Sequence, residues 1–313
     1  MGDDARVLGA AEMTRVLALC ALDPVTSVLA ATNLEVAARR GLPTAGGQVW
    51  GWPTTGPLRA ICWSGANLVP VMPEATSSAG QGGTAERDRA VAAALLAFGK
   101  LARAQGRRSS AIAGVDVLVL GLWAHLKNHW PPPREIRSHQ PSMAISHDPD
   151  MLPDPLVRQT RPTDLDTLLP ACVAMFTEEV GYSPAAGPGT VYRERMRGLI
   201  RDGRSFARFA TPPISDPFAL PQGPPVVFKA ELGAVMCGPS PEQSVAQVQG
   251  VWIEPTLRGR GLAVPGMAAV VRHARRQGFG TVSLYVNGYN QRAIDTYRKV
   301  GFTQRGTFAT IHF

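Results

Sequence analysis

The spacing of apolar residues along the first half of the chain predicts a series of helices and strands. Apolar and polar positions alternate with helical spacing over residues 12–40, and Asp23-Pro24 marks the start of a second helix within that stretch. Short runs rich in aromatic and β-branched residues, separated by turn residues, indicate strands. The elements expected further along are strands at 48–52, 58–63 and 67–71, a helix at 84–104, a strand at 110–113, a helix at 114–128 and an extended segment near 134–146.

The second half repeats this order of elements without any evident repetition of sequence. The expected elements are an extended segment at 156–161, helices from Thr163 to about Glu179 and at 190–202, strands at 205–210, 226–237 and 245–253, a helix ending at Gly278, a strand at 281–286, a helix at 290–299 and one or two strands up to Phe313. The shared order predicts a duplicated α+β unit. Residues 148–155, rich in proline and aspartate, are the expected linker between domains at 1–147 and 156–313.

Composition narrows the class of protein. A chain of 313 residues with 45% hydrophobic and 18% charged residues is typical of a globular protein. The net charge is +8, but only four of the 32 basic residues are lysines and there is no basic tail, so we expect no nucleic-acid partner. The four cysteines lie far apart, which predicts neither a disulfide framework nor a metal cage. The acidic start, MGDDARV, and the lack of a long apolar run predict a cytoplasmic protein without a membrane span.

Residues 251–266, VWIEPTLRGRGLAVPG, join an apolar strand to a helix through a loop rich in glycine and arginine. The first N–H groups of a helix have no intrahelical partner and carry partial positive charge, which suits a phosphate. Gly259 and Gly261 would let a phosphate approach the backbone, and the two arginines beside them would add charged donors. Pro265 supports a helix start near Gly261, because proline is tolerated in the first turn of a helix. Together these features favour an anion site over a plain glycine-rich turn.

At this loop the sequence resembles the GCN5-related N-acetyltransferases (GNATs), which carry the pattern R-x-x-G-x-A. The matching residues are Arg258, Gly259, Arg260, Gly261, Leu262 and Ala263. The resemblance implies that the backbone amides of this loop hold the pyrophosphate of acetyl-CoA. It also implies that the preceding strand, Val251, Trp252 and Ile253, pairs with the pantetheine arm through its main chain. The fold it implies is the GNAT fold, a mixed, mostly antiparallel sheet flanked by helices, here as two GNAT-like units in tandem.

A second stretch, VSLYVNGYNQRAIDTYRKVGF at 282–302, strengthens the resemblance. GNATs have here a strand, then N-x-x-A-x-x-x-Y on a helix, then G-F, matched by Asn290, Ala293, Tyr297, Gly301 and Phe302. Asn290 and Tyr297 are two helical turns apart and share a face. The resemblance implies that Asn290 contacts the pantetheine and that the Tyr297 phenol lies near the thioester sulfur, where a phenol can protonate a departing thiolate. Taken alone, Asn290 could simply cap the helix and Tyr297 could be a core aromatic.

The general base stays open at this stage. Many GNATs carry a glutamate on the strand before the loop, but this chain has Gln247 and Gln249 there and no carboxylate. Glu231, on the strand before, is one candidate, and a water chain to solvent is another. The residues expected at the acceptor pocket are Glu178, Glu179, Tyr182 and Tyr285, each of which could equally be a solvated carboxylate or a core aromatic.

The first half has the same element order but lacks both motifs. After its third strand comes a segment with Gly82-Gly83 and no R-x-x-G-x-A, and its last helix has no tyrosine. His125 and His129 lie i, i+4 on that helix, but with no third ligand nearby we expect no metal site. We expect a degenerate GNAT unit that shapes the acceptor cleft or a dimer contact. The whole pattern resembles an uncharacterised actinobacterial group of tandem GNATs.

The leading hypothesis is an acetyl-CoA-dependent N-acetyltransferase that transfers acetyl directly to a primary amine of a small molecule or peptide. No cysteine falls at a position that suggests an acyl-enzyme. Two alternatives remain: a transferase of a longer acyl or aminoacyl group on the same fold, and a non-catalytic acyl-CoA-binding module. We expect a monomer or a homodimer.

Overall fold

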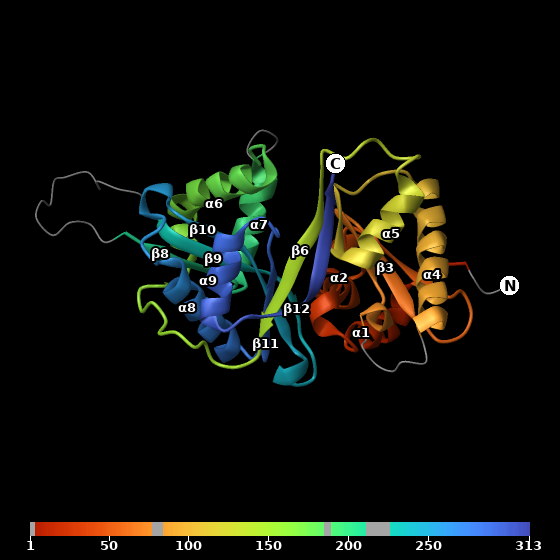
Figure 1. Ribbon diagram of the computed structural model, residues 1–313, viewed down its shortest axis with the longest axis horizontal. Helices are drawn as coiled ribbons and strands as arrows, with labels where there is room; N and C mark the ends of the chain where they lie inside the picture. Colours follow the sequence, from red (N-terminus) through yellow and green to blue (C-terminus); the bar gives the residue numbers. More distant parts are fainter. Residues whose placement is uncertain (1–3, 77–83, 185–188, 211–225) are drawn as a thin grey trace, which may run out of the picture.

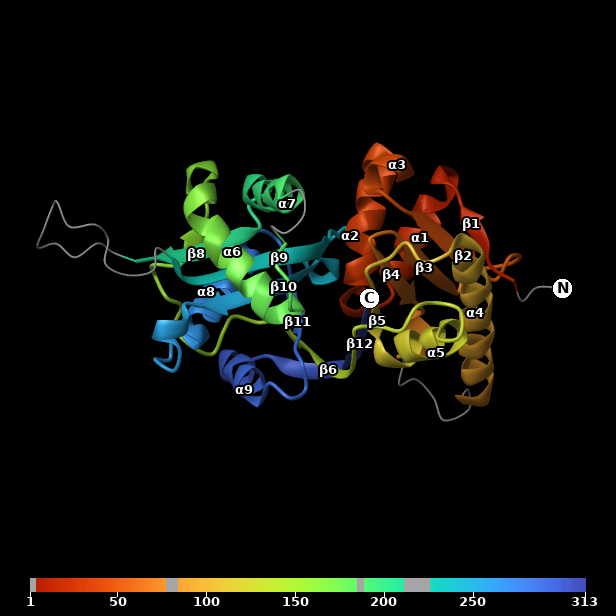
Figure 2. The same cartoon turned by 90° about the horizontal axis from the view of Figure 1, so that it is seen from above.

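The computed structural model describes residues 4–76, 84–184, 189–210 and 226–313. The two halves of the chain lie side by side along the longest axis of the molecule (Figures 1 and 2). Both contain helices packed on strands, and one sheet continues from one half into the other. The predicted α+β class is confirmed.

The first half follows the order expected from its sequence pattern. Its elements are β1 (Arg6–Leu8), α1 (Met13–Cys20), α2 (Pro24–Arg40), α3 (Leu42–Ala45), β2 (Gln48–Trp52), β3 (Ala60–Ser64), β4 (Asn67–Val71), α4 (Thr84–Gln105), β5 (Ala111–Val115), α5 (Asp116–Leu126) and β6 (Glu135–Ile145). Asp23 begins α2 as predicted, because its carboxylate accepts a hydrogen bond from the backbone N–H of Thr26. β1 was not predicted, because three residues are too few to show a pattern.

The second half repeats the order. Its elements are β7 (Arg158–Gln159), α6 (Leu165–Val180), α7 (Thr190–Arg201), β8 (Ser205–Phe209), β9 (Val226–Met236), β10 (Val245–Ile253), α8 (Ala263–Arg276), β11 (Thr281–Tyr285), α9 (Gln291–Val300) and β12 (Thr303–His312). Gly301 ends α9 with a φ of 109°, a conformation that favours glycine. The final segment is one strand, not two.

The two halves exchange their last strands. The described residues form a sheet of twelve strands in the order β1-β2-β3-β4-β5-β12-β6-β11-β10-β9-β8-β7. β12, from the end of the chain, lies between β5 and β6, and β6, from the first half, lies between β12 and β11. β6 and β12 run together through the middle of the molecule (Figure 1). Each half therefore depends on a strand of the other to complete its part of the sheet.

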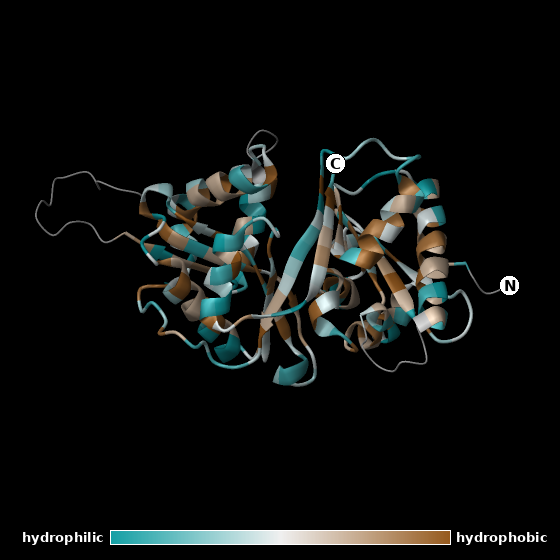
Figure 3. Ribbon diagram, viewed as in Figure 1, coloured by the Kyte–Doolittle hydropathy of each residue, from teal (hydrophilic) through white to brown (hydrophobic). Residues whose placement is uncertain are grey.

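Hydrophobic clusters on both faces of the sheet join the halves further. One cluster packs α8 and α9 on the second half, and another packs α4 and α5 on the first half. A third combines α1 and α2 with Ala234, Met236 and Val245 of β9 and β10, so α2 covers part of the second half's sheet. Hydrophobic and hydrophilic residues alternate along α4 and α9, as expected of helices with one buried face (Figure 3).

Residues 148–155 contain neither helix nor strand, but they are anchored to the second half. The Asp154 carboxylate accepts a hydrogen bond from Arg208 at 2.8 Å, and the Asp154 N–H donates to the carbonyl of Pro265. The division of the chain at this segment stays a prediction.

Candidate active site

The candidate site lies where two parallel strands separate. β10 and β11 are paired only at Val245–Gln247 and Thr281–Ser283. Beyond Gln247, β10 stays paired with β9 as far as Ile253, while β11 pairs with β6. The main chain of Val251 to Ile253 therefore has no strand partner on its β11 side within the described part of the chain. At the fork itself, Gln247 Nε2 and Ser283 Oγ are buried and have no hydrogen-bond partner among those residues.

A bulge in β10 accompanies this separation. The register between β10 and β9 shifts between Gln249 and Trp252, and Gly250 has a φ of 60°. A Cβ at Gly250 would lie 1.9 Å from Oε2 of Glu231, so only glycine fits here. The bulge therefore rests directly on a carboxylate.

The side chains of Lys229 and Glu231, both on β9, support the bulge. Lys229 is fully buried, and its ammonium donates to the carbonyl of Gly250 at 2.8 Å and pairs with Glu231 at 2.6 Å. A part-buried carbonyl that a bulge removes from the ladder needs another donor, which Lys229 supplies. Glu231 is 4% exposed and committed to this pair, so its contacts favour a structural role, and its role as general base remains a prediction.

The Arg-Gly loop follows β10. Gly259 and Gly261 have φ values of 80° and 78°, and α8 begins at Ala263, two residues after the predicted start. No side chain caps α8, and its first intrahelical bond runs from Gly266 N to Leu262 O. The first-turn amides are therefore free of protein partners within the described residues. A Cβ at Gly261 would meet nothing within 4 Å, so the backbone is open to a ligand there.

Arg258 lies beside this loop but turns toward α6. Its Nη2 donates to both oxygens of Glu178, at 3.0 and 2.7 Å, and its Nε donates to the carbonyl of Ile253. Glu178 also accepts from the indole of Trp252 at 3.3 Å. The predicted acceptor residue Glu178 is thus tied to the loop. Arg260 is exposed.

α9 presents the two predicted residues of the second motif. Asn290 caps the helix, since its side chain accepts from Ala293 N at 3.1 Å. Tyr297 is 8% exposed and packs edge-on against Phe302. Burial, and then the nearby charge of Glu179, raises the pKa of the Tyr297 phenol. The phenol therefore keeps its proton throughout the neutral range.

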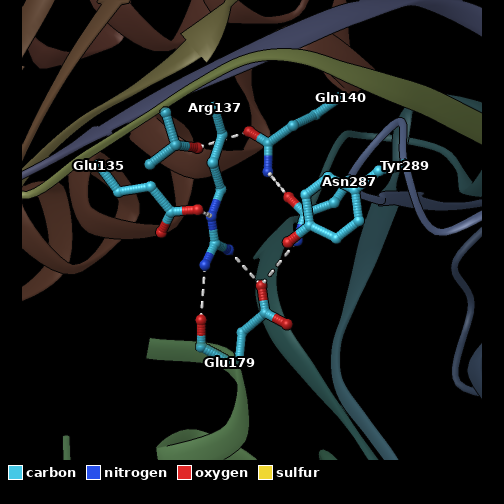
Figure 4. A network of polar contacts seen from close by, with 7 residues as sticks. Glu135, Arg137, Gln140, Glu179, Asn287 and Tyr289 are labelled. Atoms are coloured by element: carbon cyan, nitrogen blue, oxygen red, sulfur yellow. Dashed lines mark hydrogen bonds and ion pairs between the residues drawn. The ribbon is translucent and has the colours of Figure 1, made fainter. Parts of the chain in front are cut away.

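Glu179 is held by a polar network that spans both halves (Figure 4). Arg137 of β6 contacts the Glu179 carboxylate and donates to its backbone carbonyl at 2.5 Å. Asn287, after β11, donates to the same carboxylate oxygen at 3.3 Å and accepts from Gln140 at 2.8 Å. The Glu179 side chain is 53% exposed. Its charge also acts on the Tyr297 phenol and helps to raise the pKa of that group.

The two predicted aromatic pocket residues differ in exposure. Tyr182 is 47% exposed and packs between Phe176 and the guanidinium of Arg134. Tyr285 stacks on Phe308 at 5.4 Å between ring centroids, and burial raises its pKa. Tyr182 is available to a ligand, whereas Tyr285 is mainly packed against the first half's core.

Sequence reasoning missed Lys229, Arg137 and Asn287. A lysine two residues before a glutamate in the apolar strand VVFKAELGA was a usable signal, because both side chains point to one buried face. For Arg137 no local signal existed, since its partners come from the other half. The structure also shows that Cys172 is buried, which raises the pKa of its thiol to about 12, so it is not a poised nucleophile.

Three other expectations concerned metal binding, membrane spanning and the glycine pair of the first half. The described residues contain no group of three or more His, Cys, Asp or Glu side chains placed to hold a metal. His129 contacts Arg103 instead, at 3.1 Å. No helix within the described ranges is long and apolar enough to cross a bilayer. Gly82-Gly83 lie outside the described residues.

Comparison with known sequences finds one family model in each half of the chain. The profile "Acetyltransferase (GNAT) family" matches residues 201–302, and "Domain of unknown function (DUF4081)" matches residues 47–168. A mycothiol acetyltransferase of Rhodococcus erythropolis is 42% identical over 65 residues, which is 21% of each chain. An uncharacterized N-acetyltransferase of Methanocaldococcus jannaschii is 28% identical over 64 residues, 20% of this chain and 28% of its own. The matched segments thus span between a fifth and a third of these relatives.

Solved structures match the chain over its whole length. A tandem GNAT protein from the clavulanic acid biosynthesis pathway superposes with a TM-score of 0.53, 15% identity and coverage of 99% of this chain and 98% of its own. A GNAT-family acetyltransferase from Colwellia psychrerythraea gives 0.51, with 12% identity and 99% coverage of both chains. The fold is therefore that of a tandem GNAT. Residues 201–302 match the GCN5-related N-acetyltransferase family, and both predicted motifs lie within them.

Proposed function

We propose that the protein transfers an acetyl group from acetyl-CoA directly to a primary amine. The observation that carries this is the fork between β10 and β11, which opens directly before a loop of left-handed glycines and an uncapped helix. That arrangement suits a ligand with an extended amide-bearing arm and a diphosphate. Four relatives named mycothiol acetyltransferases support acetyl as the group transferred.

The chain's own groups fit the ligand in three places. The main chain of Val251, Trp252 and Ile253 has no strand partner toward β11 and would bond the pantetheine arm. Residues 259–263 would hold the pyrophosphate with their amides, since the Arg258 amide already donates to the Pro255 carbonyl. The Asn290 carboxamide oxygen is used in capping, which leaves its NH2 group for the arm.

The transfer step follows from these positions. The amine nitrogen attacks the thioester carbonyl carbon, and the carbon–sulfur bond breaks. The sulfur takes the proton of the Tyr297 phenol, whose raised pKa keeps it protonated until that moment. The amine's surplus proton passes to solvent, and Tyr297 regains its own proton from solvent. Glu179 would receive the acceptor as an ammonium, which loses one proton to solvent before its nitrogen attacks. Tyr182 is exposed and could line the same site.

Two measurements test this proposal. Acetyl-CoA should raise the melting temperature increasingly with its concentration, because a ligand that binds only the folded state stabilises it. Release of free CoA thiol should then depend on an added primary amine. Stabilisation without amine-dependent release by any member of a broad amine panel would favour the non-catalytic alternative, and no stabilisation would refute both.

A further inference from the structure

We propose that Arg137, a residue of the first half, is a positioning residue of the second half's acceptor site. It holds Glu179 so that one carboxylate oxygen faces an acceptor ammonium. The inference rests on the proposed function for its acceptor, but it can be tested by binding alone. It gives the strand exchange a role in substrate recognition.

The exchange places β6 at the edge of the site. β6 pairs with β11 only at Ser142–Ile145, so its earlier residues extend past the end of β11. Backbone N–H groups of Val286 and Gly288 donate to Pro141 and His139 along this stretch. Arg137 lies just beyond, opposite the last turn of α6.

Arg137 is also held in place by contacts other than those with Glu179. Its side chain is 9% exposed and also pairs with Glu135 of the same strand at 2.9 Å. Burial alone would lower its pKa, but the two carboxylates more than offset this and raise it. The guanidinium is therefore a permanent charge that can orient the Glu179 carboxylate.

The network uses only one oxygen of Glu179. Arg137 and Asn287 both contact Oε1, and Oε2 accepts no hydrogen bond from the described residues. Figure 4 shows the two contacts meeting at one oxygen while the other points away from the network. The half-exposed side chain thus offers a free anionic oxygen, and its charge already acts on Tyr297.

The neighbouring carboxylate is arranged differently. Both oxygens of Glu178 are taken by Arg258, on the side of the loop. If Glu179 only linked the two halves, we would expect both of its oxygens to be paired in the same way. Because Oε2 has no partner among the described residues, it suits a ligand that brings its own donor, such as a protonated primary amine.

The rest of the network explains how the position is kept. Asn287 is fixed by Gln140, which in turn accepts from Thr310 of β12 at 2.7 Å. Residues of β6, β12 and α6 therefore fix the position of Glu179 together, and β6 and β12 are the two strands that the halves exchange.

The test compares n-butylammonium with n-butanol as ligands of the full-length protein. Each is titrated at constant ionic strength, with and without CoA, and the melting temperature is recorded. We expect a stabilisation by the ammonium compound that rises with the logarithm of its concentration above Kd, and none by the alcohol. Glu179→Gln and Arg137→Gln should each weaken ammonium binding about tenfold, since a charge-assisted hydrogen bond is lost or misplaced.

Three further variants make the result specific. Arg137→Lys keeps the charge and should restore part of the binding, and it serves if Arg137→Gln does not fold. The double variant Arg137→Gln/Glu179→Gln should be no weaker than Glu179→Gln alone, because Arg137 acts through Glu179. Arg305→Gln, at an exposed arginine of β12, should bind as the wild type does.

Equal ammonium binding by Arg137→Gln and wild type would overturn the inference, as would effects of the two single variants that multiply. A wild type that does not distinguish the ammonium compound from the alcohol would also overturn it. Failure of the proposed function shows separately, as the absence of any stabilisation by CoA or acetyl-CoA.

Discussion

The two halves differ most at their matching pairs of parallel strands. In the second half, β10 leaves β11 at a glycine bulge that a buried lysine supports. In the first half, β4 and β5 likewise pair over a short stretch, here of two positions, Asn67–Leu68 with Ala111–Ile112. There Met72, Leu95, Phe98 and Leu118 belong to one packed core and line a space too small for a water molecule.

The same strand arrangement is surrounded by different side chains in the two halves. The strand beside β4 is β3, whose five residues are buried and uncharged, whereas the strand beside β10 carries Lys229 and Glu231. The helix after β5 buries leucine and valine, whereas the helix after β11 buries Tyr297. Apolar side chains pack at the first half's fork, whereas a buried ion pair and a glycine bulge lie beside the second half's fork.

The largest effect should come from Lys229→Met. It leaves Glu231 buried without its cation and Gly250 without its donor, so the free energy of unfolding should fall by about 3–5 kcal/mol. Lys229→Met/Glu231→Leu should recover most of that stability but not the acetyl-CoA affinity. In the first half, Ile61→Val should cost about 1 kcal/mol and leave affinity unchanged. Urea unfolding measures the free energy of unfolding, and calorimetric titration measures the acetyl-CoA affinity. A Lys229→Met variant with unchanged stability and affinity would contradict the comparison.

Tyr297→Phe should lower kcat about a hundredfold, the usual contribution of a general acid. The acetyl-CoA KM should change little, since only the phenolic proton is removed. Because burial and Glu179 raise the pKa of Tyr297, its protonated form persists as pH rises, so this group should not produce an alkaline loss of kcat in the wild type. Steady-state kinetics across pH check this. A variant with full kcat at every pH would remove Tyr297 from the mechanism.

Gly261→Ala and Gly106→Ala form a matched pair across the halves. Both glycines have a left-handed φ, 78° and 73°, and a Cβ at either would meet nothing within 4 Å. Each substitution should therefore cost a similar amount of stability, about 1 kcal/mol. Only Gly261→Ala should weaken acetyl-CoA binding, by about fivefold, because only its Cβ enters the expected phosphate site. Equal affinities in the two variants would place the cofactor elsewhere.

Arg258→Gln should have the smallest effect. Its pair with Glu178 is exposed on both sides, so stability should hardly change. Acetyl-CoA affinity should fall about threefold, with a weaker salt dependence than the wild type, because one charge near the phosphates is lost. Titrations at two salt concentrations check this, and an unchanged salt dependence would show that Arg258 serves only Glu178.

Much of the fold was predictable because its patterns are local. Helices such as α2 carry their own start signals, and the second half's strands stand out as apolar runs between turn residues. The exchange of β6 and β12 was not predictable, since alternation marks a strand but not its neighbour in the sheet. The residues of the two motifs could be named for the same local reason. Lys229 and Arg137 act on partners that only the folded sheet brings near them, so their roles needed the structure.

The most direct test is the stoichiometry of acetyl-CoA binding to the full-length protein by calorimetric titration. An open fork in one half and a packed core in the other predict one acetyl-CoA per chain, with affinity lost in step with changes at Gly250 and Lys229. Two acetyl-CoA per chain would contradict the closure of the first half, and one that binds equally well to Lys229→Met would contradict the fork as the site.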